Sequence, residues 1–234
     1  MLHESQAISG VLTQAGLALR CQQSVELNKR ISETLVDLKR DHPRCDLAMR
    51  AVSLAHEHHS GFLRLMDSEH FATGAAVLRP IAEASTFSHW VSYAAPKEWV
   101  AAFATPQAWD QPNLDDMIRA LAKCKPEMPG LQSLRDLLRT YAWKRYHSFT
   151  HGGVEQLGRR AETVTFNPIE CRANFLMADN FLLAGASIYA AWFESAALIN
   201  FFKSEVGRAG QELKDIFDGP DVPEWKGLPM PVLD

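Results

Sequence analysis

The stretch FLLAGASIYAAWFESAALINFF, residues 181–202, decides the fold class of this chain. It approaches the length of a membrane span, which needs about 20 predominantly apolar residues, and Glu194 is its only charged residue. Alanine, serine and glycine are nevertheless frequent in it, and Asn200 lies near its end. We therefore expect a buried central helix of an all-α fold rather than a helix in a membrane.

The preceding residues extend this stretch into the longest helix of the chain. Asn167 can serve as the N-cap, and Pro168 suits the first helical position because no partner is needed there for an N–H group. Glu170 completes the capping pattern at the third position. We expect one continuous helix from Asn167 to about Glu205.

Helical periodicity also dominates the rest of the chain, and the segment ETVTF, residues 162–166, is too short to found a sheet. An N-terminal helical arm from about Glu4 to Arg40, with interruptions, should end at the breaker Asp41-His42-Pro43. Further helices are predicted over residues 46–66, 71–93, 98–103, 113–125 and 131–151. We expect a single α-helical domain with a bundle core over residues 45–205 and an extended, proline-rich tail over 219–234.

The composition is that of a globular protein and excludes several classes. The net charge of −4 provides no general basic field for nucleic acid, so any contact with RNA would have to be local. The four cysteines show no close pairing, which indicates reduced thiols rather than a disulfide framework. The N-terminus MLHESQAISG lacks the basic and apolar regions of a signal peptide. These features predict a cytoplasmic protein that does not enter a membrane.

Two charges stand out in the apolar helix predicted over residues 71–93. Arg79 and Glu83 are spaced i, i+4 and therefore share one helix face. Pro80 between them should kink or restart the helix, because it lacks a backbone donor. A charge on an apolar face is costly unless it is paired. Arg79 and Glu83 should therefore form either a structural ion pair or part of a pocket.

The segment YAWKRYHSFTHGG, residues 141–153, carries the most suggestive chemistry. Arg145 and His151 lie about 120° apart on a regular helix, so they converge only if the helix ends near His151, and the following Gly152-Gly153 provides such an end. A guanidinium can hold a phosphate while a histidine transfers protons near neutral pH. This pair is suited to metal-independent cleavage of RNA.

The histidines also allow a competing interpretation. His147 and His151 are spaced i, i+4, as two metal ligands would be, with Glu83 or His58 as a third ligand. No recognised zinc motif accompanies them, so we expect no metal and no cofactor. In the helix over residues 46–66 the apolar stripe passes through His58, which should point inward. His56 and His59 could bind a metal together, although burial of one of them is the commoner arrangement.

Together these residues resemble the HEPN superfamily, in particular bacterial HEPN-like domains of unknown function. The resemblance rests on the inward His58, on the segment VLRPIAE over residues 77–83, and on a later helix that carries Tyr141, Arg145 and His151 followed by glycine. It covers roughly residues 46–205. It implies a helical bundle, commonly dimeric, with a metal-independent ribonuclease site used in toxin and antiphage systems.

The resemblance also assigns roles. Arg145 would bind the phosphate and His151 would be the catalytic histidine, with Arg79, Glu83, His147, His58 and Tyr141 in the pocket or behind it. The implied partners are RNA, a second copy of the chain, and an antitoxin or regulatory protein. Active members often carry Asn, Asp or His after the arginine, whereas this chain has Tyr146. A non-catalytic ligand-binding or dimeric assembly module is therefore the alternative.

Overall fold

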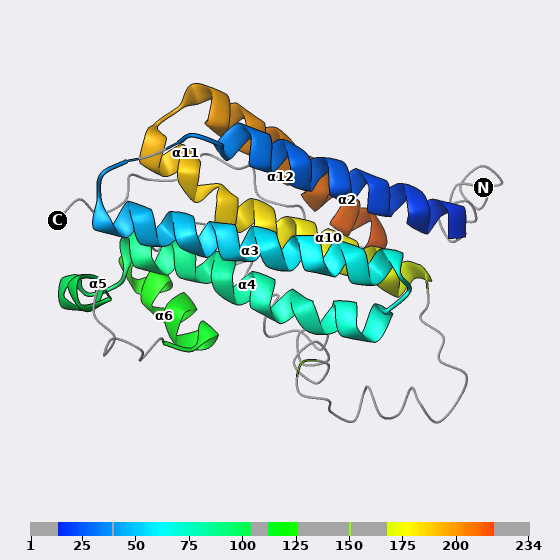
Figure 1. The fold of residues 1–234 in the computed structure, drawn as a ribbon, viewed down its shortest axis with the longest axis horizontal. Coiled ribbons are helices and arrows are strands. Elements are labelled where there is room, and N and C mark those ends of the chain that lie inside the picture. The colour runs from blue at the N-terminus through cyan, green and yellow to red at the C-terminus, as the bar shows by residue number, and fades with distance from the viewer. Residues whose placement is uncertain (1–13, 39, 104–111, 126–149, 151–167, 218–234) are drawn as a thin grey trace.

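The computed structural model describes residues 14–38, 40–103, 112–125, 150 and 168–217, and every regular element in these ranges is an α-helix (Figure 1). The predicted all-α class is therefore confirmed. The helices are α2 (Gln14–Leu35), α3 (Pro43–Asp67), α4 (Phe71–Tyr93), α5 (Lys97–Ala102), α6 (Leu114–Cys124), α10 (Pro168–Ala186), α11 (Ile188–Phe193) and α12 (Ala196–Phe217). The helix predicted over 131–151 and the tail over 219–234 lie outside the described residues, apart from Thr150.

An antiparallel pair, α3 and α4, forms the face of the bundle seen in Figure 1. Pro43 occupies the first turn of α3, where a proline costs no hydrogen bond, and the His42 ring accepts from the backbone N–H of Arg44 at 3.3 Å. The two helices approach closely near their connection, since a Cβ at Gly74 would lie 2.8 Å from the Met66 sulfur. The α4 helix runs without interruption through Pro80.

The central element is α10, which packs against α2, α3, α4 and α12. Within the described part of the chain, only the run Pro168–Phe193 is long and apolar enough to cross a membrane, and 89% of its most apolar window is buried in the fold. Such burial is that of a core helix in a soluble protein. The sequence expectation of a buried central helix is confirmed in this respect.

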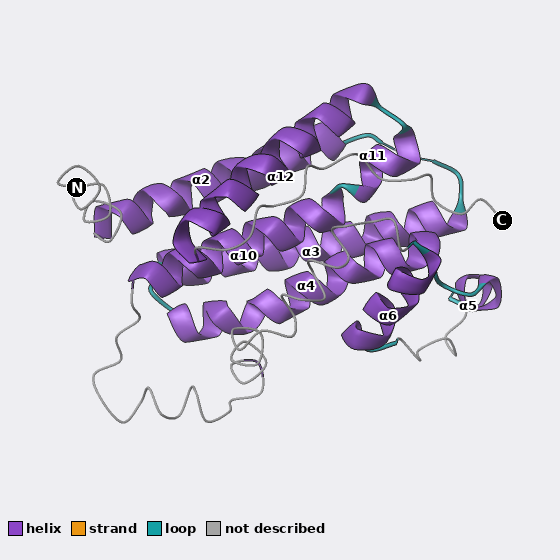
Figure 2. Cartoon of the chain, turned by 180° about the vertical axis from the view of Figure 1, so that it is seen from behind, coloured by secondary structure: helices purple, strands orange, loops and turns teal. Residues whose placement is uncertain are grey.

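The predicted continuous helix from Asn167 to Glu205 was wrong. A turn at Ser187 separates α10 from α11, and a second break follows at Glu194, which has φ 49° in the left-handed region. Residues other than glycine rarely adopt this conformation, and neither glycine nor proline marks the position in the sequence. The chain turns there and returns as α12, which lies beside α2 and α10 in both views (Figures 1 and 2).

The N-terminal helix is part of the bundle rather than an arm beside it. Leu27 and Ile31 of α2 are each 1% exposed, and α2 packs on α3 and α10. The core therefore begins well before residue 45, the boundary expected from the sequence. At the other end of the bundle, α5 and α6 lie near the end of α4 (Figure 2). The α6 helix starts as predicted, because the Asn113 side chain accepts from the N–H of Asp116 at 3.0 Å.

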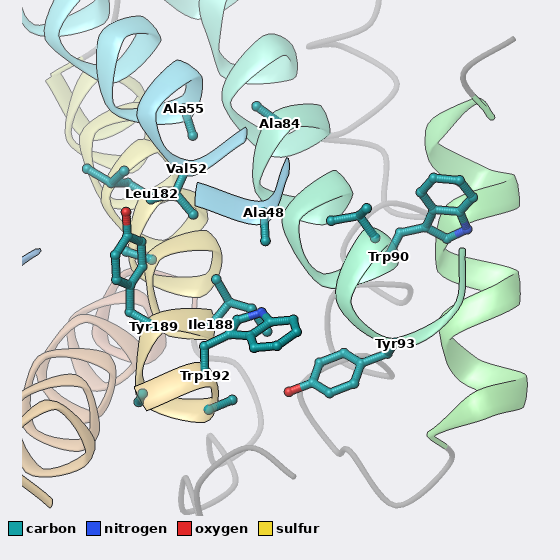
Figure 3. Close-up of a cluster of buried hydrophobic side chains, with 14 of the residues drawn as sticks. Ala48, Val52, Ala55, Ala84, Trp90, Tyr93, Leu182, Ile188, Tyr189 and Trp192 are labelled. Atoms are coloured by element: carbon teal, nitrogen blue, oxygen red, sulfur yellow. The ribbon is translucent and has the colours of Figure 1, made fainter. Parts of the chain in front are cut away.

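Large aromatic side chains fill the core where α3, α4 and α11 meet (Figure 3). Trp192 is fully buried, and its indole N–H donates to Ser92 at 3.0 Å. Small residues on α3, such as Ala48 and Ala55, leave room for these rings. Truncating a fully buried tryptophan typically costs about 3–5 kcal/mol, so this cluster is a principal source of stability.

Candidate functional site

Four of the residues predicted for the site, Tyr141, Arg145, His147 and His151, lie outside the described residues. Thr150, the neighbour of His151 in sequence, is described. Its hydroxyl donates to the backbone carbonyl of Ala76 in α4 at 3.2 Å. This carbonyl would ordinarily accept from the N–H of residue 80, which is a proline and has none. Pro80 therefore leaves an acceptor on α4 that Thr150 uses.

Arg79 and Glu83 lie on the same face of α4 as Ala76, at i+3 and i+7 from it. The Nε atom of Arg79 donates to Oε1 of Glu83 at 2.7 Å. The side chains are 22% and 35% exposed, so the pair is neither buried in the core nor freely solvated. The predicted pairing is confirmed, and its position at the surface leaves both a structural and a pocket role open.

A surface cavity of about 550 Å³ lies along α3. The described residues that line it are Ser53, His56, Glu57, His58, Ser60, Gly61, Arg64, Leu65 and Val77. His56 Nε2 donates to the backbone carbonyl of Asn28 at 3.1 Å, and the Ser60 hydroxyl lies 3.4 Å from Oδ1 of the same asparagine. The α2 helix therefore holds one wall of the cavity in place.

The expectation that His58 points inward was wrong by one residue. His59 is fully buried, whereas His58 is half-buried and lines the cavity. The buried stripe of α3 follows its small residues, Ala48, Ala51 and Ala55, and Leu54 is 46% exposed. The stripe expected from the sequence ran through Leu47, Ala51, Leu54, Phe62 and Leu65. Of these, Leu47, Ala51 and Phe62 are buried, whereas Leu54 is exposed and Leu65 is only partly buried.

A buried polar network surrounds Asp179 in the middle of α10. Its Oδ2 accepts from Arg20 and, at 3.0 Å, from the Ser24 hydroxyl. Its Oδ1 lies 2.9 Å from Nε2 of His59. Asp179, Ser24 and His59 are fully buried and Arg20 is 3% exposed, so α2, α3 and α10 meet around one carboxylate. Glu212 of α12 lies 3.6 Å from Nε of Arg20 and adds a second negative charge nearby.

The neighbours of His59 define the hydrogen atoms on its ring. The Asn28 amide nitrogen, which can only donate, lies 2.9 Å from Nδ1, so Nδ1 accepts. Nε2 then carries the hydrogen and donates to Asp179. The hydrogen-bonded chain runs from Arg20 through Asp179, His59 and Asn28 to the cavity wall.

Burial by itself opposes ionisation of Asp179. The hydrogen bond from His59, the charge of Arg20 and the hydrogen bond from Ser24 outweigh this effect and hold the pKa of Asp179 below its usual range. The carboxylate is therefore ionised in the folded protein at neutral pH. Ser24 donates to the carboxylate rather than to His59, so this group is not a nucleophilic triad. Without access to solvent, the network serves the fold and the orientation of Asn28.

Sequence reasoning missed this network, although one signal was present. Asp179 is the only charged residue between Arg172 and Glu194, in a run as apolar as the one that singled out Arg79 and Glu83. The same rule, that such a charge needs a partner, applies to it. No group of three His, Cys, Asp or Glu side chains in the described ranges is placed to hold a metal ion, and His147 and His151 lie outside them.

These features define an all-α bundle with a buried ionic network and a polar cavity on its surface. The chain belongs to a family of unknown function, DUF6988, whose model matches residues 52–204. The match includes the cavity, the face of α4 and Asp179, whereas Arg20, Ser24 and Asn28 precede it. Neither a curated protein nor a solved structure matches the chain.

Proposed function

We propose that this protein is a HEPN-like, metal-independent endoribonuclease whose site lies on the face of α4, with Arg145 and His151 as the working pair. The observation that carries the proposal is the hydrogen bond from Thr150 to Ala76. It ties the neighbour in sequence of His151 to the helix face that presents Arg79 and Glu83. The described neighbour of His151 therefore contacts the helix that carries Arg79 and Glu83, and this contact supports the proposal.

The chemistry needs no cofactor. The ribose 2′-hydroxyl loses its proton to a base as its oxygen attacks the phosphorus, and the 5′-oxygen takes up a proton as its bond to phosphorus breaks. His151 transfers a proton in this exchange, and Arg145 stabilises the negative charge that grows on the phosphate oxygens. Glu83 orients the Arg79 guanidinium through their 2.7 Å bond, and Arg79 can then contact a neighbouring phosphate.

The proposed setting is the cytoplasm, in a toxin or antiphage system, as a homodimer controlled by an antitoxin or regulatory protein. The net charge of −4 means that RNA must be attracted by a local group of cationic residues rather than by the whole surface. The cationic residues assigned to the site, Arg79, Arg145 and His151, meet this requirement.

A second candidate is a non-catalytic ligand-binding or assembly module, and a specific observation favours it. Glu83 already neutralises Arg79, so this pair can stabilise α4 without any ligand. In that case Arg145 would organise a dimer interface, and Tyr146 would mark a site without catalytic activity.

An RNA cleavage assay separates the two. We would compare the wild type with Arg145→Ala and His151→Ala, in the presence of a chelator, on single-stranded and structured RNA. Matched controls are His70→Ala, because His70 is exposed and makes no capping bond, and Arg119→Ala, whose side chain is 56% exposed on α6. Cleavage that is lost in the two site variants and kept in the controls supports the ribonuclease. Equal activity in all five proteins overturns it, and RNA binding or dimerisation without cleavage favours the second candidate.

A further inference from the structure

We propose that the cavity on α3 is a binding site for a phosphate-type oxyanion whose donors belong to the described lining rather than to the Arg145 and His151 pair. Its described lining combines one arginine, two histidines and two serines with a single carboxylate, Glu57. Phosphate oxygens accept hydrogen bonds from arginine, histidine and serine side chains, and a guanidinium can hold two of these oxygens at once.

Three donors in the described lining, Ser53, His58 and Arg64, have no partner among the described residues. Among the described residues, neither the Arg64 guanidinium nor the His58 ring makes an ion pair or side-chain hydrogen bond, and the Ser53 hydroxyl has no partner either. Every other arginine of α3 is engaged: Arg44 donates to carbonyls at the end of α4, and Arg50 pairs with Asp46. Arg64 is therefore the arginine of this helix that is available to a ligand.

The wall of the cavity is held in place from inside the fold. His56 uses Nε2 on the Asn28 carbonyl, which leaves Nδ1 as the ring atom without a partner in the described ranges. Asn28 is fixed in turn by His59, which is fixed by Asp179 and Arg20. The anchored His56 ring therefore loses less entropy when a ligand arrives than a free side chain would.

Gly61 supplies the open space. A Cβ at this position would meet nothing within 4 Å, although the residue lies in the interior of α3, where glycine is less favourable than alanine. Neither a turn nor a close helix contact explains a glycine here. An unoccupied volume above the helix does explain it, because a side chain would project into the cavity.

The ligand is an anion rather than a metal ion. His56 and His58 are spaced i, i+2, so they do not share one helix face, and the described residues contain no set of metal ligands here. Glu57 is the only carboxylate in the described lining, so little negative charge opposes an anion there. A phosphate ion and the phosphate of an RNA strand share this chemistry.

The test is titration with inorganic phosphate, followed by calorimetry and by the NMR signals of the histidine rings, with chloride at equal ionic strength as the control. Arg64→Gln should weaken binding at least tenfold. Gly61→Met should abolish it, because the new side chain fills the cavity while the helix gains a better helix-forming residue. Arg50→Gln and Gly207→Met are the matched controls, since Arg50 is exposed elsewhere on α3 and a Cβ at Gly207 of α12 also meets nothing within 4 Å.

Phosphate binding that is absent from the wild type, or unchanged in Gly61→Met, overturns the proposal. A parallel titration with single-stranded RNA distinguishes the sources: Gly61→Met should weaken RNA binding if the cavity receives a phosphate of the strand, and should leave it unchanged if the ligand is a free ion. His151→Ala should bind inorganic phosphate as the wild type does. Loss of phosphate binding in His151→Ala would mean that His151 takes part in binding at the cavity. This result would contradict the proposal, whatever the outcome of the cleavage assay.

Discussion

The network around Asp179 and the cavity on α3 are the two ends of one chain of hydrogen bonds, and they differ in what is left unpaired. Both oxygens of Asp179 accept bonds from protein groups and no solvent reaches them. In the cavity, Arg64 and His58 make no such bonds to the described residues. Buried charge must be satisfied internally, whereas a surface site can keep its donors for a ligand. Polar side chains in this bundle therefore serve the fold at one end and recognition at the other.

The largest expected effect comes from Asp179→Ala. Among the described residues, the change leaves the buried Arg20 with the more distant Glu212 as its remaining anionic partner, and it removes the acceptor of Ser24 and His59. Breaking one partner of a buried ion pair typically costs about 3–5 kcal/mol. Urea denaturation should show a loss of this size.

A double variant is the control for this loss. Arg20→Met combined with Asp179→Leu removes both charges and should recover much of the stability, since apolar replacement of a buried pair is often neutral or stabilising. A single Asp179→Ala variant as stable as the wild type would contradict the internal role of the network.

Acid pH should reduce the contribution of Asp179 to the stability of the protein. The pKa of Asp179 is below its unfolded value because His59, Arg20 and Ser24 outweigh the effect of burial. Its contribution to stability is therefore complete above about pH 4, near the unfolded pKa, and is lost as the pH falls through the lower folded pKa. Asp179→Asn lacks this contribution at every pH. The difference in unfolding free energy between wild type and Asp179→Asn should therefore shrink as the pH falls below about 4, and a constant difference would contradict the assignment.

The next two predictions concern two glycines, Gly185 in the core and Gly61 at the cavity, which differ in the space around them. Gly185 of α10 faces α4 so closely that a Cβ would lie 2.9 Å from the Cα of Ser85, a backbone atom that cannot move aside. Gly185→Ala should therefore destabilise the protein by about 1–3 kcal/mol, the usual cost of overpacking. Thermal unfolding measures it. Ser85→Gly in the same chain removes the side chain that crowds the new methyl group and should recover only part of the loss, because the backbone contact remains.

The sequence predicted the helices well where local signals mark their ends. The Asn113 cap of α6 and Pro43 in the first turn of α3 follow from capping and proline rules. The break at Glu194 did not, because a left-handed residue without glycine is imposed by the packing of α12 rather than by local preference.

The candidate site was less predictable for a related reason. The inward histidine was misplaced because the buried stripe of α3 includes the small residues Ala48 and Ala55 but leaves out Leu54, so the helical phase could not be judged from the largest side chains. The pairing of Arg79 with Glu83 was predictable, because both partners lie on one helix. The partners of Asp179 come from α2 and α3, more than one hundred residues earlier, and only the folded arrangement brings them together.

A substitution at Gly61, the glycine at the cavity, should stabilise the protein, in contrast to Gly185→Ala. Gly61→Ala adds a Cβ into open space in the interior of a helix, and we expect a gain of about 0.5–1 kcal/mol in unfolding free energy. Gly207→Ala on α12 is the matched control and should gain a similar amount. Destabilisation by Gly61→Ala alone would mean that other parts of the chain fill the cavity, and the contrast between the two ends would fail.

The smallest expected change in stability is that of Glu83→Gln, which keeps the shape of the side chain and removes its charge. A partly exposed i, i+4 pair contributes only about 0.3–0.5 kcal/mol, so urea denaturation should hardly distinguish this variant from the wild type. Its effect on RNA cleavage should be larger, because Arg79 loses the carboxylate that orients it toward a phosphate. If stability and cleavage both stay unchanged, the pair of Arg79 and Glu83 contributes neither to the fold nor to the site. If cleavage falls while stability stays unchanged, Arg79 and Glu83 act in the recognition of RNA rather than in the stability of the fold.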